Sequence, residues 1–486
     1  MHDVAPFALV VAVCALALLA AAGSSRVSER LRIPAPAIFL VAASVSVDLW
    51  PHHLGSLSIR ADQRVVTVAL VLILFEGGMH IGLDRFRPVA GGVVWLGVAG
   101  TFVTGGAVAL LAHGLFGFDW RGALLLGTAL APTDPAVVFS VLGRREVSGR
   151  TGTLLEGESG ANDPVGIALM LAILGATGAG WGAVAHGAGE FALQMVLGIA
   201  FGIAGGLGLR WLLQHVPLPN EALYPLRAVA FALLVYGVAT LAHGSGFLAV
   251  LLAGILVGDT RAPYKREIER FASAASSLGE IVAFTVLGLS IPFSQALGHG
   301  HGWTGLALAA LLILVVRPLF VGLVLAPIRL RRGERAFVLW AGLKGAVPIL
   351  LGTYVLADGV PGGERIYAVI FVVVLVSVLV QGGLVPTFAR MWNVRMRVLE
   401  PEPWALGMRF RDEPEGLHRF EVEAGSAADG ATIGDLPLDE DVWISMVSRS
   451  GRLVQVRGTT ELTAGDEVLA LAADDALVSR LFRGAT

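Results

Sequence analysis

The chain has 486 residues, of which 55% are hydrophobic and only 15% are charged, and its mean hydropathy is +0.74. No ordinary soluble protein needs so much apolar surface, so the composition excludes a soluble enzyme or binding domain. Segments of about 20 apolar residues recur along the chain, and each is long enough to cross a bilayer as a helix. We therefore expect an all-α polytopic protein embedded in membrane lipid.

The apolar segments predict thirteen transmembrane helices. We expect the first segment to be retained, because its N-terminal flank carries Asp3 and no basic residue; a cleaved signal peptide is the alternative. Cys14 is the only cysteine, so no intramolecular disulfide is expected. The segments are 4–22, 33–50, 65–83, 89–113, 120–142, 151–175, 189–209, 225–243, 246–258, 274–293, 303–327, 334–357 and 366–389.

The basic residues of the connecting loops are distributed unequally between the two sides of the membrane. The loops of one side carry 18 Lys and Arg residues, and those of the other side carry 4, which are Arg60, Arg64, Arg121 and Arg365. Basic loops stay in the cytoplasm. The bias therefore predicts an external N-terminus and a cytoplasmic C-terminus in the cell membrane, as an odd number of spans requires.

The balance of charge changes near residue 398. Residues 399–486 hold 17 Asp and Glu residues and 8 Arg, a net charge of −9, whereas residues 1–398 have a net charge of +6. The last segment also contains no apolar run long enough to span a membrane. We expect a transmembrane domain at 1–398 and an acidic cytoplasmic domain at 399–486.

Ionisable side chains within transmembrane segments are costly and usually mark a pathway or a site. Lys344 is notable among them, because the chain has only two lysines. Glu280 lies near the end of an expected span, where a cytoplasmic funnel and a simple solvated helix end are both compatible with it. The full set is Glu76, Asp134, Glu156, Glu158, Asp163, Glu280, Arg317 and Lys344.

The stretch APTDPAVV, residues 131–138, should open a helix in mid-span. Pro132 and Pro135 each remove a backbone donor and clash with the preceding turn. The freed carbonyls and half-helix ends around Thr133 and Asp134 can then face an ion, as in transporters with discontinuous helices. We therefore expect Asp134 to be one of the residues that bind the cation and the proton. A simple proline kink is the alternative interpretation.

The stretch LKGAVPIL, residues 343–350, looks like the counterpart of this break. Gly345 and Pro348 weaken the helix, and Lys344 stands where the first break has Asp134. Two interrupted spans in the two halves of the chain indicate inverted repeats with crossing broken helices. A cationic side chain at the crossing would balance the helix ends there. A lysine that snorkels to the membrane surface is the alternative.

The stretch GESGANDP, residues 157–164, offers oxygen ligands on one helix. Ser159 and Asp163 are four residues apart and share a helical face. A monovalent cation prefers oxygen ligands, so K⁺ or Na⁺ could bind Asp163, Ser159 and carbonyls near Thr133. A carboxylate there holds either a proton or a metal ion, and this competition is sufficient for exchange. Alternatively, these groups only satisfy one another across helices.

Glu158 is expected to have a structural role in charge pairing. Its carboxylate should pair with Arg317 or with Lys344, because a buried acid or base without its partner leaves an uncompensated charge.

Four motifs together resemble the NhaP branch of the monovalent cation:proton antiporters. They are FEGG at 75–78, TDP at 133–135, GESGANDP at 157–164 and GLKGAVP at 342–348. The resemblance implies an NhaA-like fold, usually a homodimer. It also implies that Asp163 is the shared cation and proton carboxylate, assisted by a set of neighbouring polar groups. That set is Asn162, Ser159, Thr133 and Glu76.

The resemblance carries two further implications. The Asn162–Asp163 pair is associated with electroneutral one-for-one exchange. The family usually has arginine where this chain has Lys344, which keeps the charge but loses the bidentate guanidinium.

The tail from about residue 405 resembles the TrkA-C (RCK-C) regulatory domain of potassium-transport proteins. DVWISMVSRSGRLVQV reads as two strands around a turn at Ser450 and Gly451. LTAGDEVLALAADDALVSRLF then predicts a loop, a strand and a short helix. The resemblance implies a small α/β domain that pairs with a second copy and binds a small regulatory ligand, such as a nucleotide. No GxGxxG motif precedes it, so a dinucleotide site is not supported.

The combination of an NhaP-like body with this tail resembles potassium/proton antiporters. We expect a secondary antiporter that exchanges cytoplasmic K⁺ for external H⁺, with Na⁺ or Li⁺ exchange as the alternative. A gated cation channel would need a filter of repeated carbonyls or charged rings, and none is visible. An intramembrane enzyme is disfavoured because no His-Glu-x-x-His motif occurs. We expect no cofactor beyond the transported ions and no nucleic-acid partner.

Overall fold

A computed structural model describes residues 34–50, 58–142, 145–147, 149–176, 181–298, 300–398, 417–438, 442–449, 452–472 and 475–482. The expected first span, 4–22, and the expected turn at Ser450 and Gly451 lie outside these residues. The chain divides into two compact units, Met1–Leu399 and Glu400–Thr486.

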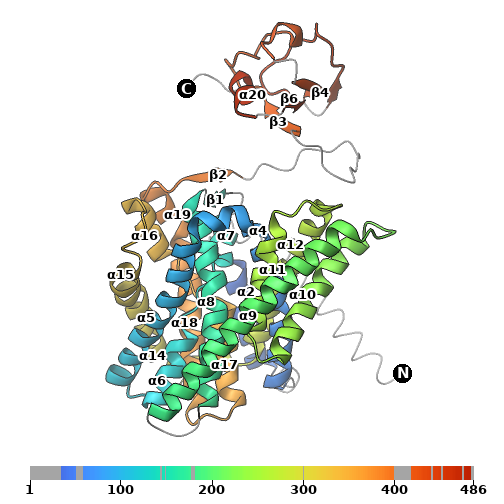
Figure 1. Cartoon of the computed structure of the whole chain (residues 1–486). Coiled ribbons are helices and arrows are strands. Elements are labelled where there is room, and N and C mark those ends of the chain that lie inside the picture. The colour runs from blue at the N-terminus through green and yellow to red at the C-terminus, as the bar shows by residue number, and fades with distance from the viewer. Residues whose placement is uncertain are drawn as a thin grey trace, which may run out of the picture. The chain divides into compact units, whose positions relative to one another are not determined.

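The first unit is built almost entirely of helices (Figure 1). Its elements are α2 (Ala35–Leu49), α4 (Ile59–Phe86), η1 (Arg87–Val89), α5 (Ala90–Phe116), α6 (Trp120–Ala129), α7 (Ala136–Leu142), α8 (Arg150–Gly175), α9 (Trp181–His215), α10 (Leu223–Leu241), α11 (Gly246–Gly258), α12 (Lys265–Leu289), α13 (Phe293–Leu297), α14 (His301–Leu311), η2 (Leu312–Val321), α15 (Gly322–Val324), α16 (Arg332–Trp340), α17 (Ala346–Ala357), α18 (Gly363–Val376), η3 (Ser377–Gly382) and α19 (Gly383–Met391).

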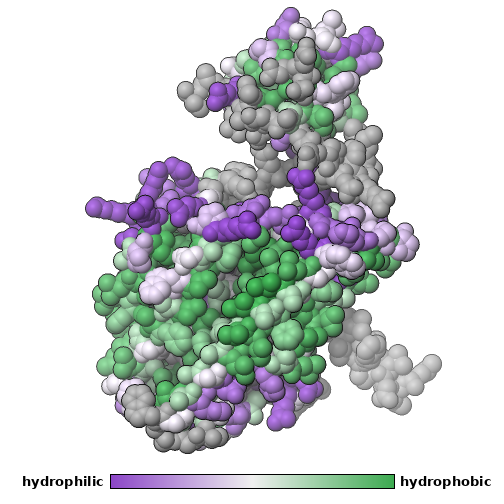
Figure 2. All heavy atoms as spheres, viewed as in Figure 1, coloured by the Kyte–Doolittle hydropathy of each residue, from purple (hydrophilic) through white to green (hydrophobic). Residues whose placement is uncertain are grey.

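The surface of this unit matches a membrane. Figure 2 shows a broad band of apolar residues across the visible face of the helices, with hydrophilic residues gathered at its two edges. Six helical stretches among the described residues are long and apolar enough to cross a bilayer. A helix suits lipid because it satisfies its backbone polar groups internally. Each expected span from 33–50 onward falls on a described helix or on consecutive helices. The total of thirteen spans stays a prediction.

Glycines let some of these helices approach one another at backbone distance. A Cβ on Gly78 of α4 would lie 2.5 Å from the carbonyl oxygen of Leu251 on α11. A Cβ on Gly254 of α11 would lie 2.5 Å from the carbonyl oxygen of Phe75 on α4. Small residues at such contacts are how membrane helices pack tightly without a hydrophobic driving force between them. α4 also packs on α12, and α12 on α2, so these four helices form one bundle.

A short antiparallel sheet joins two distant parts of the first unit. β1 (Arg145–Val147), between α7 and α8, pairs with β2 (Met396–Val398), which follows α19. Val147 lies opposite Met396 and is buried. The pairing therefore ties the loop between α7 and α8 to the end of the last helix.

The second unit is a small α/β fold. Its elements are β3 (Leu417–Glu421), η4 (Ile433–Asp435), β4 (Trp443–Arg449), β5 (Arg452–Val454), β6 (Glu467–Leu471) and α20 (Asp475–Phe482). The antiparallel sheet has the order β3-β6-β4-β5. Val447, Val468 and Phe482 belong to its separate apolar core. The strands and the short helix expected in this segment are confirmed.

An ion pair between the partly exposed Arg449 and the buried Asp466 also links residues of the second unit. Arg449 donates from Nε and Nη2 to the two carboxylate oxygens of Asp466, at 2.8 and 2.7 Å, and the Thr463 amide donates to the same carboxylate at 2.8 Å. Burial of Asp466 disfavours its charged form, but these hydrogen bonds outweigh it and lower the pKa of Asp466 below its usual value.

Candidate cation and proton site

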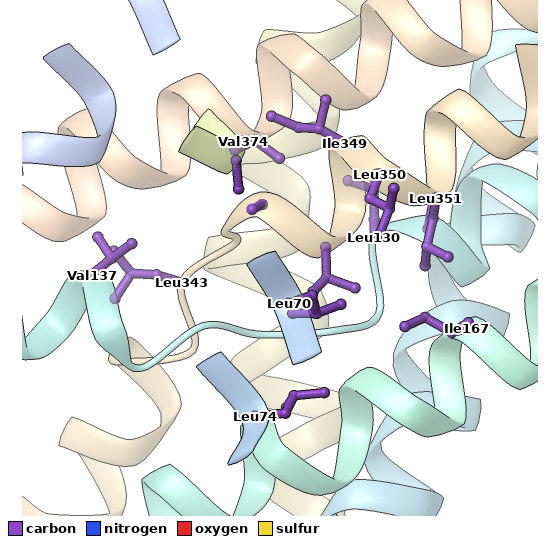
Figure 3. Packing of buried hydrophobic residues seen from close by; sticks show 14 of the residues in the cluster. Leu70, Leu74, Leu130, Val137, Ile167, Leu343, Ile349, Leu350, Leu351 and Val374 are labelled. Atoms are coloured by element: carbon purple, nitrogen blue, oxygen red, sulfur yellow. The ribbon is translucent and has the colours of Figure 1, made fainter. Parts of the chain in front are cut away.

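Two interrupted helices cross in the centre of the first unit. The chain is non-helical between α6 and α7, at 130–135, and between α16 and α17, at 341–345. The amide of Asp134 donates to the carbonyl of Leu343 across the crossing, at 2.8 Å. Figure 3 shows the two extended segments passing each other, with Leu130 and Val137 at the ends of one and Leu343 on the other. The prediction of crossing broken helices is confirmed.

Asp134 lies at the beginning of two half-helices. Its carboxylate accepts hydrogen bonds from the amides of Ala136 and Val137 at the start of α7 and of Ala346 at the start of α17. The first amides of a helix lack internal partners and carry partial positive charge. Gly345 makes this approach possible, because a Cβ there would lie 1.8 Å from an Asp134 carboxylate oxygen. Asp134 therefore binds the two helix starts to each other.

Lys344 has the opposite role at the end of α6. Its ammonium group donates to the carbonyls of Ala131 and Pro132, both at 2.9 Å, and the residue is only 1% exposed. These carbonyls follow α6 directly, where the helix dipole is negative. The expectation that a cationic side chain balances the crossing agrees with this geometry, and the alternative of a snorkelling lysine does not.

Glu158 pairs with Arg317, the first of the two partners expected for it. Arg317 Nη2 lies 2.9 Å from Glu158 Oε1, and both side chains are 4% exposed. Arg317 also donates to the carbonyls of Leu339 and Val338, in the last turn of α16, at 3.1 and 3.2 Å. The guanidinium thus neutralises one buried acid and the end of the second half-helix.

Ser159 and Asn162 hold the broken segment in place from α8. The Ser159 hydroxyl donates to the Thr133 carbonyl at 2.5 Å. The Asn162 amide oxygen accepts from the Thr133 N–H at 3.2 Å, and its nitrogen donates to the Thr133 hydroxyl at 2.8 Å. In this arrangement the three residues satisfy one another across helices. They fix the conformation of the backbone at Thr133, next to Asp134 in the first break.

Asp163 is held differently from these neighbours. It lies on α8, is 7% exposed, and its carboxylate makes no hydrogen bond with the described residues. The charges that act on it come from Asp134 and Lys344. It lines a cavity of about 420 Å³. The carboxylate is therefore available to a small ion that enters this cavity.

Carboxylates dominate the polar lining of this cavity, which has no Lys or Arg among its lining residues. They come from α4, α8, α12 and the first helix break, and they are Glu76, Asp134, Glu156, Asp163 and Glu280. Glu76 is hydrogen-bonded to Ser276 of α12, and His80 lies 3.7 Å from Glu156. The helical spacing of Glu156, Ser159 and Asp163 already places Glu156 near the face of Asp163, whereas nothing in the sequence indicated that Glu280 shares a cavity with Asp163.

A second cavity, of about 580 Å³, continues from the first. Both are lined by Glu76, His80, Ser273 and Ser277. The second cavity also contacts Arg85 and Arg270, which belong to the basic set of loops. The two cavities form an acid-lined route from the side of the basic loops to Asp163.

These features together are typical of one class of protein. Buried charged side chains lie at the ends of the half-helices that cross. An acid-lined route leads to the Asp163 carboxylate, which makes no hydrogen bond with the described residues. This is the architecture of a secondary transporter with discontinuous helices.

Comparison with known proteins identifies the family. The model of the transmembrane sodium/hydrogen exchanger family matches residues 14–391, and that of the TrkA-C domain matches residues 417–483. The chain belongs to the sodium/hydrogen exchanger family.

Two curated relatives carry potassium/proton antiporter names. A K(+)/H(+) antiporter NhaP of Alkalimonas amylolytica is 36% identical over 373 residues, which are 75% of this chain and 63% of that protein, less than two thirds of its length. A K(+)/H(+) antiporter NhaP2 of Shewanella sp. strain MR-4 is 33% identical over 479 residues, which are 96% of this chain and 82% of that protein.

A solved structure shows the same fold. The sodium proton antiporter MjNhaP1 from Methanocaldococcus jannaschii, determined at pH 8, matches with a TM-score of 0.66 and 21% identity. The match covers 77% of this chain and 99% of that one. At this identity the likeness establishes the NhaP-like fold of the membrane unit.

Proposed function

We propose that this protein is a secondary antiporter that exchanges cytoplasmic K⁺ for external H⁺ across the cell membrane. The observation that carries the proposal is the Asp163 carboxylate, which has no hydrogen bond among the described residues and lies at the inner end of an acid-lined route. Potassium is chosen over sodium because the two relatives above are named for it.

The chemistry rests on competition at one side chain. A proton and a monovalent cation cannot both be held well by Asp163, so arrival of one releases the other. Ser159 lies four residues before Asp163 on α8 and lines the same cavity, and its hydroxyl contacts the Thr133 carbonyl. These two oxygens are the further ligands that we assign to the cation. The proton and the potassium ion each carry one positive charge. One-for-one exchange of the two ions therefore moves no net charge across the membrane.

Alternating access requires the carboxylate to face the two sides of the membrane in turn. The cavity is lined by α4 and α12, which pack on each other, and by α8, the first break and the start of α17. Rocking of one group against the other moves a site between the two aqueous phases. Asp134, Lys344 and Arg317 keep the crossing intact during this movement.

The proposal also covers the orientation of the protein in the membrane and the role of its C-terminal domain. The basic loops are cytoplasmic, so residues 399–486 form a cytoplasmic domain, which binds a small regulatory ligand such as a nucleotide. The protein is a homodimer, as the resemblance to NhaP antiporters implies.

Everted membrane vesicles with an acid interior and a pH-sensitive dye test the proposal. Added K⁺ should dissipate the pH gradient, and clamping the membrane potential should leave the rate unchanged. Dissipation by Na⁺ or Li⁺ alone would support the sodium/proton alternative. A cation current without proton movement would support a channel.

The matched variants are Asp163→Asn and Asp358→Asn. Asp163→Asn should abolish exchange because an amide cannot be deprotonated. Asp358 is an exposed acid at the end of α17, and its neutralisation should leave exchange unchanged. Exchange that survives in Asp163→Asn would refute the proposed mechanism.

A further inference from the structure

One carboxylate oxygen of Glu280 is buried without a hydrogen-bond partner among the described residues. Its Oε1 is inaccessible to solvent and has no hydrogen-bond partner in the described part of the chain. Buried polar atoms are nearly always paired, and an unpaired one costs free energy. The residue lines the same cavity as Asp163, on the wall that α12 contributes. The unmet partner of this oxygen therefore belongs in the cavity.

Most of the ionisable groups that share the cavity with Glu280 are acids. α4 contributes Glu76 and His80, the first break contributes Asp134, and α8 contributes Glu156 and Asp163. α17 packs against α12 and adds only Ala346 and Val347. The charges of Asp134 and Glu76 act directly on Glu280. A cluster of this sign attracts a cation.

We propose that Glu280 is an affinity-determining residue for the transported cation. A monovalent cation that passes from the outer cavity toward Asp163 supplies the missing partner of the Glu280 carboxylate. Glu280 and Glu76 then contact the ion from the α12 and α4 wall, opposite Asp163 on α8. This inference rests on the proposed antiport, and it adds a residue that the sequence motifs do not contain.

A purely structural role for Glu280 predicts a different effect of its substitution. A permanently protonated carboxyl would donate a hydrogen bond to a fixed acceptor, and its loss would weaken the fold. A carboxylate whose partner is a passing cation has no such fixed bond. Its neutralisation should therefore weaken cation binding and leave thermal stability unchanged or higher, because a buried charge has been removed.

Vesicle exchange measurements over a range of K⁺ concentrations test the inference. We expect Glu280→Gln to raise the half-saturating K⁺ concentration by about fivefold and to change the maximal rate by less than about twofold. Glu280→Asp, which keeps the charge, should lie between Glu280→Gln and the unchanged protein. The melting temperature of each purified variant shows whether it is folded.

Glu269→Gln is the matched control. Glu269 lies on α12 and lines the outer cavity, but it is paired with Lys265 at 3.4 Å. Its neutralisation should change the half-saturating concentration little. An equal rise in both variants, abolished by added choline chloride, would mean a general surface potential and would overturn the inference.

The remaining outcomes separate the two proposals. Exchange by the unchanged protein with identical K⁺ dependence in Glu280→Gln would overturn the role of Glu280 alone. A lower melting temperature in both Glu280→Gln and Glu280→Asp, with unchanged K⁺ dependence in the folded fraction, would assign a structural role. Absence of any exchange by the unchanged protein would instead overturn the proposed function.

Discussion

At the residue scale, the charged side chains of the crossing divide by what they bind. Asp134 binds the starts of two half-helices, and Lys344 and Arg317 bind carbonyls at the ends of the other two. Asp163 and Glu280 lack such fixed partners among the described residues. The charges with fixed partners maintain the structure of the crossing, whereas Asp163 and Glu280 are available to transported ions.

Lys344 provides the first test of this division. Lys344→Met leaves the Ala131 and Pro132 carbonyls unpaired in a buried site, and each lost charged hydrogen bond is worth about 1.5–3 kcal/mol. The melting temperature in detergent should fall, and exchange should be lost. Lys344→Arg keeps the charge, so its melting temperature and its exchange activity should both be higher than those of Lys344→Met. Equal melting temperatures for Lys344→Met and the unchanged protein would contradict the assigned role.

The Glu158–Arg317 pair provides the second test. Either Glu158→Gln or Arg317→Met leaves one buried charge without its partner, which costs about 3–5 kcal/mol. The double variant removes both charges. Its loss of unfolding free energy should therefore be smaller than the sum of the losses in the two single variants. A thermal unfolding cycle measures this. Additive losses would mean that the two side chains do not interact.

The sequence predicted most of these residues but not all of their partners. It identified Glu158, Arg317 and Lys344 as one charge group, because each lies within an apolar segment and a buried charge needs a partner of opposite sign. It could not show that Lys344 binds carbonyls, since backbone acceptors carry no mark in the residue pattern. Nor could it place Glu280 in the cavity, because an acid near a span end is equally compatible with solvent.

At the element scale, the crossing depends on the absence of a side chain at residue 345. Gly345→Ala would place Cβ 1.8 Å from the Asp134 carboxylate, so the α17 start and Asp134 could no longer meet. We expect loss of exchange and a lower melting temperature. Gly106→Ala in α5 is the control, because its added Cβ meets no atom within 4 Å. That change should be neutral or slightly stabilising, by about 0.5–1 kcal/mol.

The breaks themselves were predictable, whereas other irregular elements were not. Pro132 and Pro135 have a direct physical effect on the backbone, so the sequence located the first break correctly. β1 and β2 have three residues each and lie far apart in the chain, and such short strands have no periodicity to detect. η2 is a π-helix that contains Pro318 and presents Arg317, and an apolar segment gives no sign of that geometry.

At the scale of the whole molecule, the C-terminal unit has its own pH-dependent stability, which rests on Asp466. The folded C-terminal unit lowers the pKa of Asp466, so its contribution to stability is complete above the unfolded pKa of about 3.9. That contribution is lost as the pH falls through the lower, folded pKa. Asp466→Asn should therefore destabilise residues 400–486 at pH 7 and reduce the loss of stability in acid.

Denaturant unfolding of that unit at pH 7 and at pH 3 measures the effect. Glu421→Gln, an exposed acid on β3, is the control and should retain the pH dependence of the unchanged protein. An Asp466→Asn unit with unchanged stability at pH 7 would show that the pair with Arg449 contributes nothing.

Proton release on cation binding tests the central claim most directly. Purified protein in detergent and weak buffer would receive K⁺, with choline as the control salt, while the pH of the solution is recorded. If a proton and the cation compete for Asp163, K⁺ should release protons from the unchanged protein and none from Asp163→Asn. Equal proton release by the folded Asp163→Asn variant would contradict the account.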